Sequence, residues 1–383
     1  MHGTIESVFR VEWRPLAELS QFAAEWGALA AHAVEPNVFY EPAFALAAQP
    51  VFGRDVNAGL VWSRSTPARL VGLFPARIER RRYGLPLSVL AGWTHPYAPL
   101  GAPLVDRDAA EAVIAAWLDH LALRADLPKL MLLPYCPAEG PLARAFGAAL
   151  AVRGGRSAAF APHRRALLAP SGERANYLER AVGHKKLKEL RRQKRRLGDR
   201  GVVMGSITNE PAALASALGD FLDLEAAGWK GVAGTAAKND HAIRNFMESA
   251  VPQLAGEGKA RVARLFLDTR AIAALILLRS GDTEWCWKIA YDEGVAQASP
   301  GVQVLLDVTQ AILDDESIAR ADSCATPDHP MIDHVWRERL ALADRLIGVA
   351  PRGAAQFALA RMLEGARRGA IAAAKRGRDL LRR

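Results

Sequence analysis

The sequence has few cysteines, no long apolar run and no histidine pattern typical of a metal site. Its three cysteines, Cys136, Cys286 and Cys324, are too few and too widely spaced for a disulfide framework or a paired-cysteine metal site. The nine histidines show neither HxH nor HExxH spacing, so we expect no metal. The apolar runs fall short of the roughly 20 residues that cross a bilayer. Because the first residues also carry no export signal, we expect a soluble cytoplasmic protein.

The net charge of +9 is concentrated in two segments. Residues 184–200 carry +7 and residues 361–383 carry +6, which leaves about −4 for the rest of the chain. Charged runs are usually solvated, and the first segment lacks the aromatic residues that stack on bases, so the sequence argues against a nucleic-acid partner. The second segment has a mostly alanine apolar face, which predicts electrostatic, peripheral contact with an anionic inner membrane.

The order of apolar and polar patterns predicts an α+β fold with a mostly antiparallel sheet flanked by helices. Each half of the sequence passes through three closely spaced strand-like runs to a helix and a further strand. In the second half the runs are residues 261–268, 271–280 and 283–292, followed by a helix over 301–315 and a strand over 319–325. This local similarity between the halves indicates two related domains.

We place the domain boundary near residue 165. The length of 383 residues exceeds what one hydrophobic core usually organises. We therefore expect an N-terminal domain over residues 1–165, a C-terminal domain over 166–350 and a basic amphipathic helix over 351–383. The second domain should begin with one long charged helix at about residues 174–197.

The turn between the third strand and the helix of the second half reads Ser299-Pro300-Gly301-Val302-Gln303. A strand, a Pro/Gly turn and a helix N-terminus together present unpaired backbone N–H groups and a positive dipole end, which suit a pyrophosphate. Gly301 allows close backbone approach, Pro300 fixes φ and Ser299 can cap the helix. The alternative interpretation is an ordinary capped helix start.

The third strand of the second half alternates in character. Regular pleating would place four of its side chains on one face, Trp285, Trp287, Ile289 and Tyr291. The opposite face would then carry Glu284, Cys286, Lys288 and Asp292. The two Trp residues are expected to be core.

Three stretches of the second half resemble a known family. They are FLDLEAAGWKGVAGTA (221–236), ARLFLDTRAIAALILLRSGDTEWCWKIAYDE (263–293) and ASPGVQVLLD (298–307). Together they resemble the GNAT-superfamily acetyltransferases associated with bacterial cellulose and exopolysaccharide biosynthesis, which are similar in fold to the Fem-type transferases with two GNAT modules in tandem. The resemblance implies two tandem GNAT-like domains, with a degenerate first domain and an acyl-CoA site in the second.

The resemblance also implies roles for particular residues. Acyl transfer needs a base, donors for the oxyanion and an acid for the leaving thiolate. In a GNAT fold the end of strand 283–292 flanks the acyl group, so we expect Tyr291 as acid, with Asp322 or His329 as base. The resemblance assigns acetyl-CoA, or another acyl-CoA, to the turn at Ser299, Pro300, Gly301, Val302 and Gln303. Trp229, Lys230 and Asp292 would border the acceptor, although Lys230 could equally be a solvated loop lysine.

The leading hypothesis is transfer of an acyl group from CoA to an amine or hydroxyl of a saccharide or cell-envelope precursor. Two alternatives stay open. One is a non-catalytic GNAT-fold protein that binds anionic surfaces, because the turn departs from the usual GNAT pattern. The other is a transferase that uses aminoacyl-tRNA as donor.

Overall fold

The computed structural model describes residues 8–170, 172, 174–349 and 353–381. The chain forms two compact units. Of the described residues, unit 1 takes those in 8–40, 53–163 and 341–381, and unit 2 takes those in 41–52 and 164–340. The division expected at residue 165 differs from these two units in two places. Residues 41–52 pack with unit 2, and residues 341–349 pack with unit 1.

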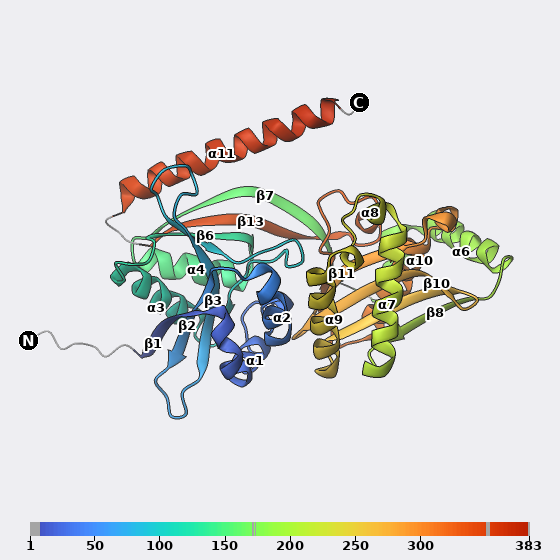
Figure 1. The fold of residues 1–383 in the computed structure, drawn as a ribbon, viewed down its shortest axis with the longest axis horizontal. Coiled ribbons are helices and arrows are strands. Elements are labelled where there is room, and N and C mark those ends of the chain that lie inside the picture. Colours follow the sequence, from blue (N-terminus) through green and yellow to red (C-terminus); the bar gives the residue numbers. More distant parts are fainter. Residues whose placement is uncertain (1–7, 171, 173, 350–352, 382–383) are drawn as a thin grey trace, which may run out of the picture. The chain divides into compact units, whose positions relative to one another are not determined.

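Unit 1 is a mixed sheet with flanking helices (Figure 1). Its strands are β1 (Phe9–Pro15), β2 (Val56–Ser63), β3 (Leu70–Glu79), β4 (Val89–Gly92), β5 (Leu104–Val105), β6 (Leu130–Pro137), the first part of β7 (Arg156–Leu168) and most of β13 (Glu338–Gly348). Its helices are η1 (Leu16–Phe22), α1 (Ala23–Ala31), η2 (Val38–Tyr40), α3 (Ala110–Leu123), α4 (Pro141–Val152) and α11 (Ala354–Leu381).

Unit 2 repeats this layout with its own strands and helices. The strands are β8 (Val203–Thr208), β9 (Ala260–Leu267), β10 (Arg270–Ser280), β11 (Thr283–Tyr291), β12 (Arg320–Asp322) and the last part of β7. The helices are α2 (Pro42–Phe52), α5 (Tyr177–Val182), α6 (His184–Gly198), α7 (Pro211–Ala227), α8 (Trp229–Val232), η3 (Ala237–Asn239), α9 (His241–Gly256), η4 (Glu293–Ala298), α10 (Pro300–Asp314) and η5 (Ile332–His334). The prediction of a single helix over 174–197 is wrong. Gly183, where φ is 84°, interrupts the helical backbone between α5 and α6.

The strands of the two units follow the same order. In unit 1 the path β1-β2-β3-β4-β6-β13 has one parallel pairing, between β4 and β6. In unit 2 the path β8-β9-β10-β11-β12-β7 also has one, between β11 and β12. In each unit the last strand comes from the other half of the sequence. The expected α+β fold with a mostly antiparallel sheet is confirmed.

Apolar periodicity explains how α10 covers one face of the unit 2 sheet. Val304, Leu305, Val308 and Ile312 recur at helical spacing and pack with buried strand residues such as Leu275. Figure 1 shows α7 and α9 on the opposite face of these strands. There α2 joins them through ring contacts of Phe44 with Phe246 and Trp287.

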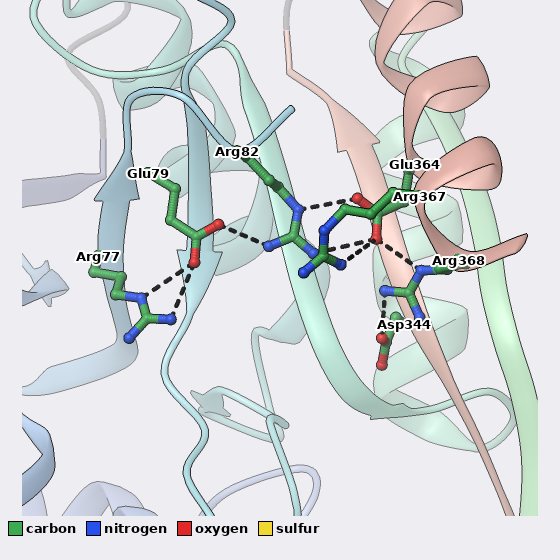
Figure 2. Close-up of polar contacts among 7 residues, drawn as sticks. All are labelled: Arg77, Glu79, Arg82, Asp344, Glu364, Arg367 and Arg368. Carbon is green, nitrogen blue, oxygen red and sulfur yellow. Dashed lines mark hydrogen bonds and ion pairs between the residues drawn. The ribbon is translucent and has the colours of Figure 1, made fainter. Parts of the chain in front are cut away.

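Helix α11 docks on unit 1 by its first turns. Phe357 and Ala360 are buried in an apolar cluster with residues of β4, β6 and β13. Figure 2 shows the ionic network beside it: the fully buried Glu364 accepts hydrogen bonds from Arg82 at 2.9 Å and Arg368 at 2.7 Å, and Arg368 also contacts Asp344 at 2.6 Å. The apolar side of this part of the helix therefore faces protein. Among the described residues, no helix combines the length and apolarity needed to cross a bilayer.

Candidate functional site

Strands β11 and β12 of unit 2 separate after a short parallel pairing. They pair only through Thr283 with Arg320, Glu284 with Ala321, and Trp285 with Asp322. Strand β11 then continues to Tyr291, whereas the chain leaves the sheet after Asp322. A cavity of about 400 Å³, here named the transfer cavity, lies where they separate. Its walls are formed by Cys286–Ile289 and Tyr291 of β11, by Ser323–Ala325 and His329–Ile332 of segment 323–332, and by Trp229, Lys230, Leu275 and Leu305.

A β-bulge in β11 interrupts the alternation of its side chains beside this cavity. In the pairing with β10, Cys286 lies opposite Leu277 and Lys288 lies opposite Ile276. The register therefore skips Trp287. Beyond the bulge Ile289 packs against the α10 core, whereas Trp287 contacts Phe246 on the other face. The expectation that Trp287 and Ile289 share a face is therefore wrong, because a bulge interrupts the two-residue alternation of a strand.

Lys288 is the cavity residue that the sequence interpretation missed. The half-buried Lys288 lines the cavity beside Lys230 and Cys324. Burial, together with the nearby charge of Lys230, lowers the pKa of the Lys288 ammonium to about 8. A minor fraction of Lys288 is therefore already neutral near physiological pH, and a neutral amine can accept a proton. The signal in the sequence was a single lysine within the otherwise apolar run WCWKIAY.

Lys230 and Trp229, both predicted to border the acceptor, line the transfer cavity. Lys230 Nζ lies 2.5 Å from Oε1 of the buried Glu225, whose second oxygen accepts the Ala237 N–H at 2.8 Å. The Lys230 ammonium also lies 5.9 Å from the Trp229 ring centroid. Lys230 is therefore held in place beside the cavity by an ion pair at the end of α7.

Tyr291 and His329 both line the transfer cavity. Tyr291 is 38% exposed and also lines a neighbouring hollow of about 590 Å³. His329 Nδ1 accepts the Met331 N–H at 3.4 Å. In the neutral ring this contact places the proton on Nε2, so that His329 would donate from Nε2 rather than accept there.

Asp322 and Asp292 do not line the transfer cavity. Asp322 is 2% exposed, forms an ion pair with the buried Arg165, and accepts the Cys324 N–H at 3.0 Å. It therefore fixes the segment that forms one cavity wall. Asp292 lines the neighbouring hollow, where it binds Arg270 at 2.6 Å and caps Gly294 at 2.7 Å.

The turn expected to hold a diphosphate is covered by side chains. Ser299 has a left-handed φ of 51°, and Pro300 occupies the first turn of α10. Gly301 is buried, and a Cβ there would lie 3.0 Å from the Tyr291 ring and 3.2 Å from Met331 Sδ. The buried Gln303 donates its side-chain N–H to the Leu190 carbonyl at 2.8 Å. Neither these residues nor the half-buried Val302 line the transfer cavity.

In unit 1 the equivalent strands are β4 and β6, and the loop that follows β4 closes the space where they separate. There β4 and β6 pair only through Leu90 with Met131 and Ala91 with Leu132. The loop after β4 then passes against β6, where the Gly101 N–H donates to the Tyr135 carbonyl at 3.3 Å. A side chain at Gly101 would collide with the Pro134 carbonyl, so glycine is required for this close approach.

One group of potential metal ligands occurs among the described residues. The ligand atoms of His32, Asp106 and Asp108 lie within 4.8 Å of one another in unit 1. However, Asp106 already pairs with Arg69 at 3.0 Å, and His32 contacts Asp108 at 2.8 Å. We assign no metal to this group.

Comparison with known proteins agrees with this geometry. Residues 184–329 match the family model described as an acetyltransferase (GNAT) domain. The chain is similar to the crystal structure of FemX, with a TM-score of 0.55 and 10% identity over 86% of this chain and 96% of that one. No curated protein sequence matches it significantly.

Two further solved structures share the fold. One is a conserved protein of unknown function from Bacteroides thetaiotaomicron, with a TM-score of 0.53 and 11% identity over 88% of this chain and 99% of that one. The other is the C-terminal domain of a protein assigned as a lysylphosphatidylglycerol synthetase from Agrobacterium fabrum, with a TM-score of 0.51 and 11% identity over 90% and 96%. The chain therefore has a GNAT-like fold, as the resemblance implied.

Proposed function

We propose that the transfer cavity is the site of an acyltransferase that moves an acetyl or other acyl group from CoA to an amine or hydroxyl. The observation that carries the proposal is the separation of β11 from β12, which leaves a cavity with Lys288, Tyr291 and His329 in its walls. This cavity lies in the region that matches the acetyltransferase domain, apart from its last residues 330–332.

The cavity side chains suit the steps of a direct transfer. The acceptor nitrogen or oxygen attacks the thioester carbonyl and gives its proton to the neutral Lys288 amine. The His329 Nε2–H donates to the developing oxyanion. As the C–S bond breaks, the Tyr291 hydroxyl protonates the leaving thiolate. Asp322 acts as a positioning residue, because its contacts are with Arg165 and the Cys324 amide.

The acceptor class follows from analogy with the structural neighbours. FemX and the domain assigned to a lysylphosphatidylglycerol synthetase share the fold. We propose a saccharide or another cell-envelope precursor as acceptor, bordered by Trp229 and Lys230. Association of this chain with exopolysaccharide biosynthesis, and peripheral contact of α11 with an anionic membrane, stay predictions from the sequence.

Calorimetric titration with acetyl-CoA tests the proposed donor. Ala325→Trp would fill the transfer cavity, whereas Ala227→Trp adds the same volume to an exposed position in the neighbouring hollow. We expect the unmodified chain and Ala227→Trp to bind, and Ala325→Trp to lose binding while keeping its circular dichroism spectrum. If the unmodified chain does not bind acetyl-CoA, the proposed donor is wrong.

The covered turn at Gly301 favours a second candidate, a donor other than CoA. An aminoacyl-tRNA donor would not need the diphosphate turn beneath Tyr291 and Met331. RNA that copurifies with the chain and is released by ribonuclease, together with a negative titration with acetyl-CoA, would favour this candidate.

A further inference from the structure

Strand β8 forms a free edge of the unit 2 sheet. It ends the path of paired strands and pairs with β9 residue for residue, without a register shift. The Asp268 N–H donates to the Val202 carbonyl at 2.7 Å, so the carbonyl of Val202 points toward β9. Because these directions alternate along an antiparallel strand, the backbone N–H and C=O groups of Val203, Gly205 and Ile207 point away from β9. No hydrogen bond among the described residues uses these outward groups.

The edge is uncharged and keeps apolar side chains in water. Residues 201–209 contain no Asp, Glu, Lys, Arg or Pro. Val202 is 70% exposed, Met204 is 55% exposed, and Ile207 is exposed as well. Natural proteins usually protect an edge strand with charges, proline or a bulge, because an unprotected edge pairs readily with another strand. We therefore expect a further strand to cover β8.

Strand β1, at the equivalent end of the unit 1 path, has the protection that β8 lacks. Glu12 pairs with Arg10 at 2.5 Å and also with Arg14, and Pro15 ends the strand. Charged side chains at every second position oppose the addition of a strand. The contrast between the two edges indicates that β8 is used for association.

The sequence around β8 is complementary to a second copy of itself. When two copies pair antiparallel about a two-fold axis at Gly205, Val203 lies opposite Ile207 of the second copy. The outward backbone groups of Val203, Gly205 and Ile207 then meet one another, and each hydrogen-bonded pair exchanges two bonds. In the same register Arg200 lies opposite Glu210 of the second copy. The two-fold axis repeats every one of these contacts.

The charged residues at the two ends of the strand are available for this contact. Arg200 and Glu210 are both exposed, and neither has an ion-pair partner in the described parts of the chain. A pairing shifted by two residues would separate Arg200 from Glu210 of the second copy. The end charges therefore select one register, and they select it for a second copy of this chain.

We propose that β8 is a dimerisation edge, through which two copies of the chain join antiparallel about Gly205. The occupant is a second copy because both the apolar centre and the charged ends of the strand match themselves in this register. A single strand pairing forms a small interface, so the dimer is reversible and forms at high protein concentration. The inference does not depend on the proposed function.

Sedimentation velocity on the full chain, from about 1 μM to about 200 μM, tests the proposal. At about 0.15 M salt the basic α6 helices of two copies are screened beyond about 8 Å, whereas directly opposed side chains still interact. We expect a monomer–dimer equilibrium. Monomer at every concentration, or growth beyond a dimer, would overturn the proposal.

Ile207→Pro tests the backbone pairing. It removes an outward N–H and leaves the bonds to β9, because proline is tolerated where the N–H of an edge strand faces solvent. We expect the dissociation constant of the dimer to rise by about tenfold or more, with an unchanged circular dichroism spectrum. A folded variant that dimerises as well as the parent would contradict the proposed edge.

A charge exchange tests the register with surface substitutions that leave the core intact. Arg200→Glu places two acidic residues opposite each other and should raise the dissociation constant by about threefold or more. Arg200→Glu/Glu210→Arg restores opposite charges and should return it to within about twofold of the parent. Arg54→Glu, at a fully exposed site of unit 1, is the control for net charge and should have no effect. Failure of the double variant to recover would exclude this pairing.

Discussion

The ring of Tyr291 lies over Gly301, so closely that a Cβ at Gly301 would be 3.0 Å from Tyr291 Cδ1. Tyr291 thus connects the transfer cavity with the first turn of α10. This contact explains why position 301 must be small even though the turn is covered. It also predicts that changes at Gly301 act on catalysis through Tyr291.

Gly301→Ala should displace the Tyr291 ring by a few tenths of an ångström and lower kcat by about three- to tenfold, at a stability cost of about 1–3 kcal/mol. The KM for acetyl-CoA should change by less than about twofold. Steady-state kinetics measures both constants. A large rise in KM with kcat unchanged would show instead that the turn itself holds the donor phosphates.

Lys288 should impose a pH dependence on the reaction. If the neutral amine accepts the acceptor's proton, kcat/KM rises with pH and levels off above the Lys288 pKa of about 8. Lys288→Met should abolish this limb and lower kcat by about 10²–10⁴-fold. Lys238→Met, at an exposed site outside the cavity, serves as the control. If kcat/KM still rises with pH in the Lys288→Met variant, Lys288 is excluded as the base.

Lys288→Met should also stabilise the fold at neutral pH. Burial lowers the pKa of Lys288 from 10.5 to about 8, so between these values the unfolded chain binds more protons than the folded chain. The contribution of Lys288 to stability therefore rises as pH increases through this window. Urea unfolding should show a variant that is more stable than the parent at pH 7, with a difference that narrows toward pH 10. A difference independent of pH would contradict this account.

Asp322→Asn tests the positioning role of Asp322. Removing one partner of the buried pair with Arg165 should reduce the free energy of unfolding by about 3–5 kcal/mol, because an unpaired charge is left buried. The pH profile of kcat/KM should keep its shape. If the variant lost the rise of kcat/KM with pH but kept its stability, Asp322 would be identified as the catalytic base. Asp322→Leu/Arg165→Met, which removes both charges, should recover most of the stability.

Glu364 should make unit 1 sensitive to acid. Burial acts to raise the pKa of Glu364, but hydrogen bonds and charges of Arg82 and Arg368 outweigh it and lower the pKa from 4.5 to about 2. The stabilisation is therefore present above pH 4.5 and lost as pH falls toward 2. Glu364→Gln should reduce the free energy of unfolding by about 3–5 kcal/mol at pH 7. The exposed Glu139→Gln is the control, and an equal effect of the two substitutions would contradict the network's role.

The local sequence was sufficient to predict the strands and helices around the site. Closely spaced apolar runs gave β9, β10 and β11 in order, and Pro300 marked the start of α10. These features depend on neighbouring residues. The predicted α+β fold is confirmed for the same reason, since fold class follows from the order of elements.

The remaining features depend on contacts between distant residues. The bulge at Trp287 interrupts the alternation of β11, and Lys288, which follows it, lies in the cavity wall. The packing of α2 on α9 and the placement of β13 beside β6 join segments far apart in the sequence. Gln303 looks like a turn residue in the sequence, yet its side chain anchors α6. Periodicity contains no information on such pairings.

The most direct test of the account is a crystal structure of the chain grown with acetyl-CoA. We predict that the thioester lies between β11 and segment 323–332, with Lys288, Tyr291 and His329 around it. Electron density for the donor outside this cavity, with no part of the donor between the strands, would contradict the central claim.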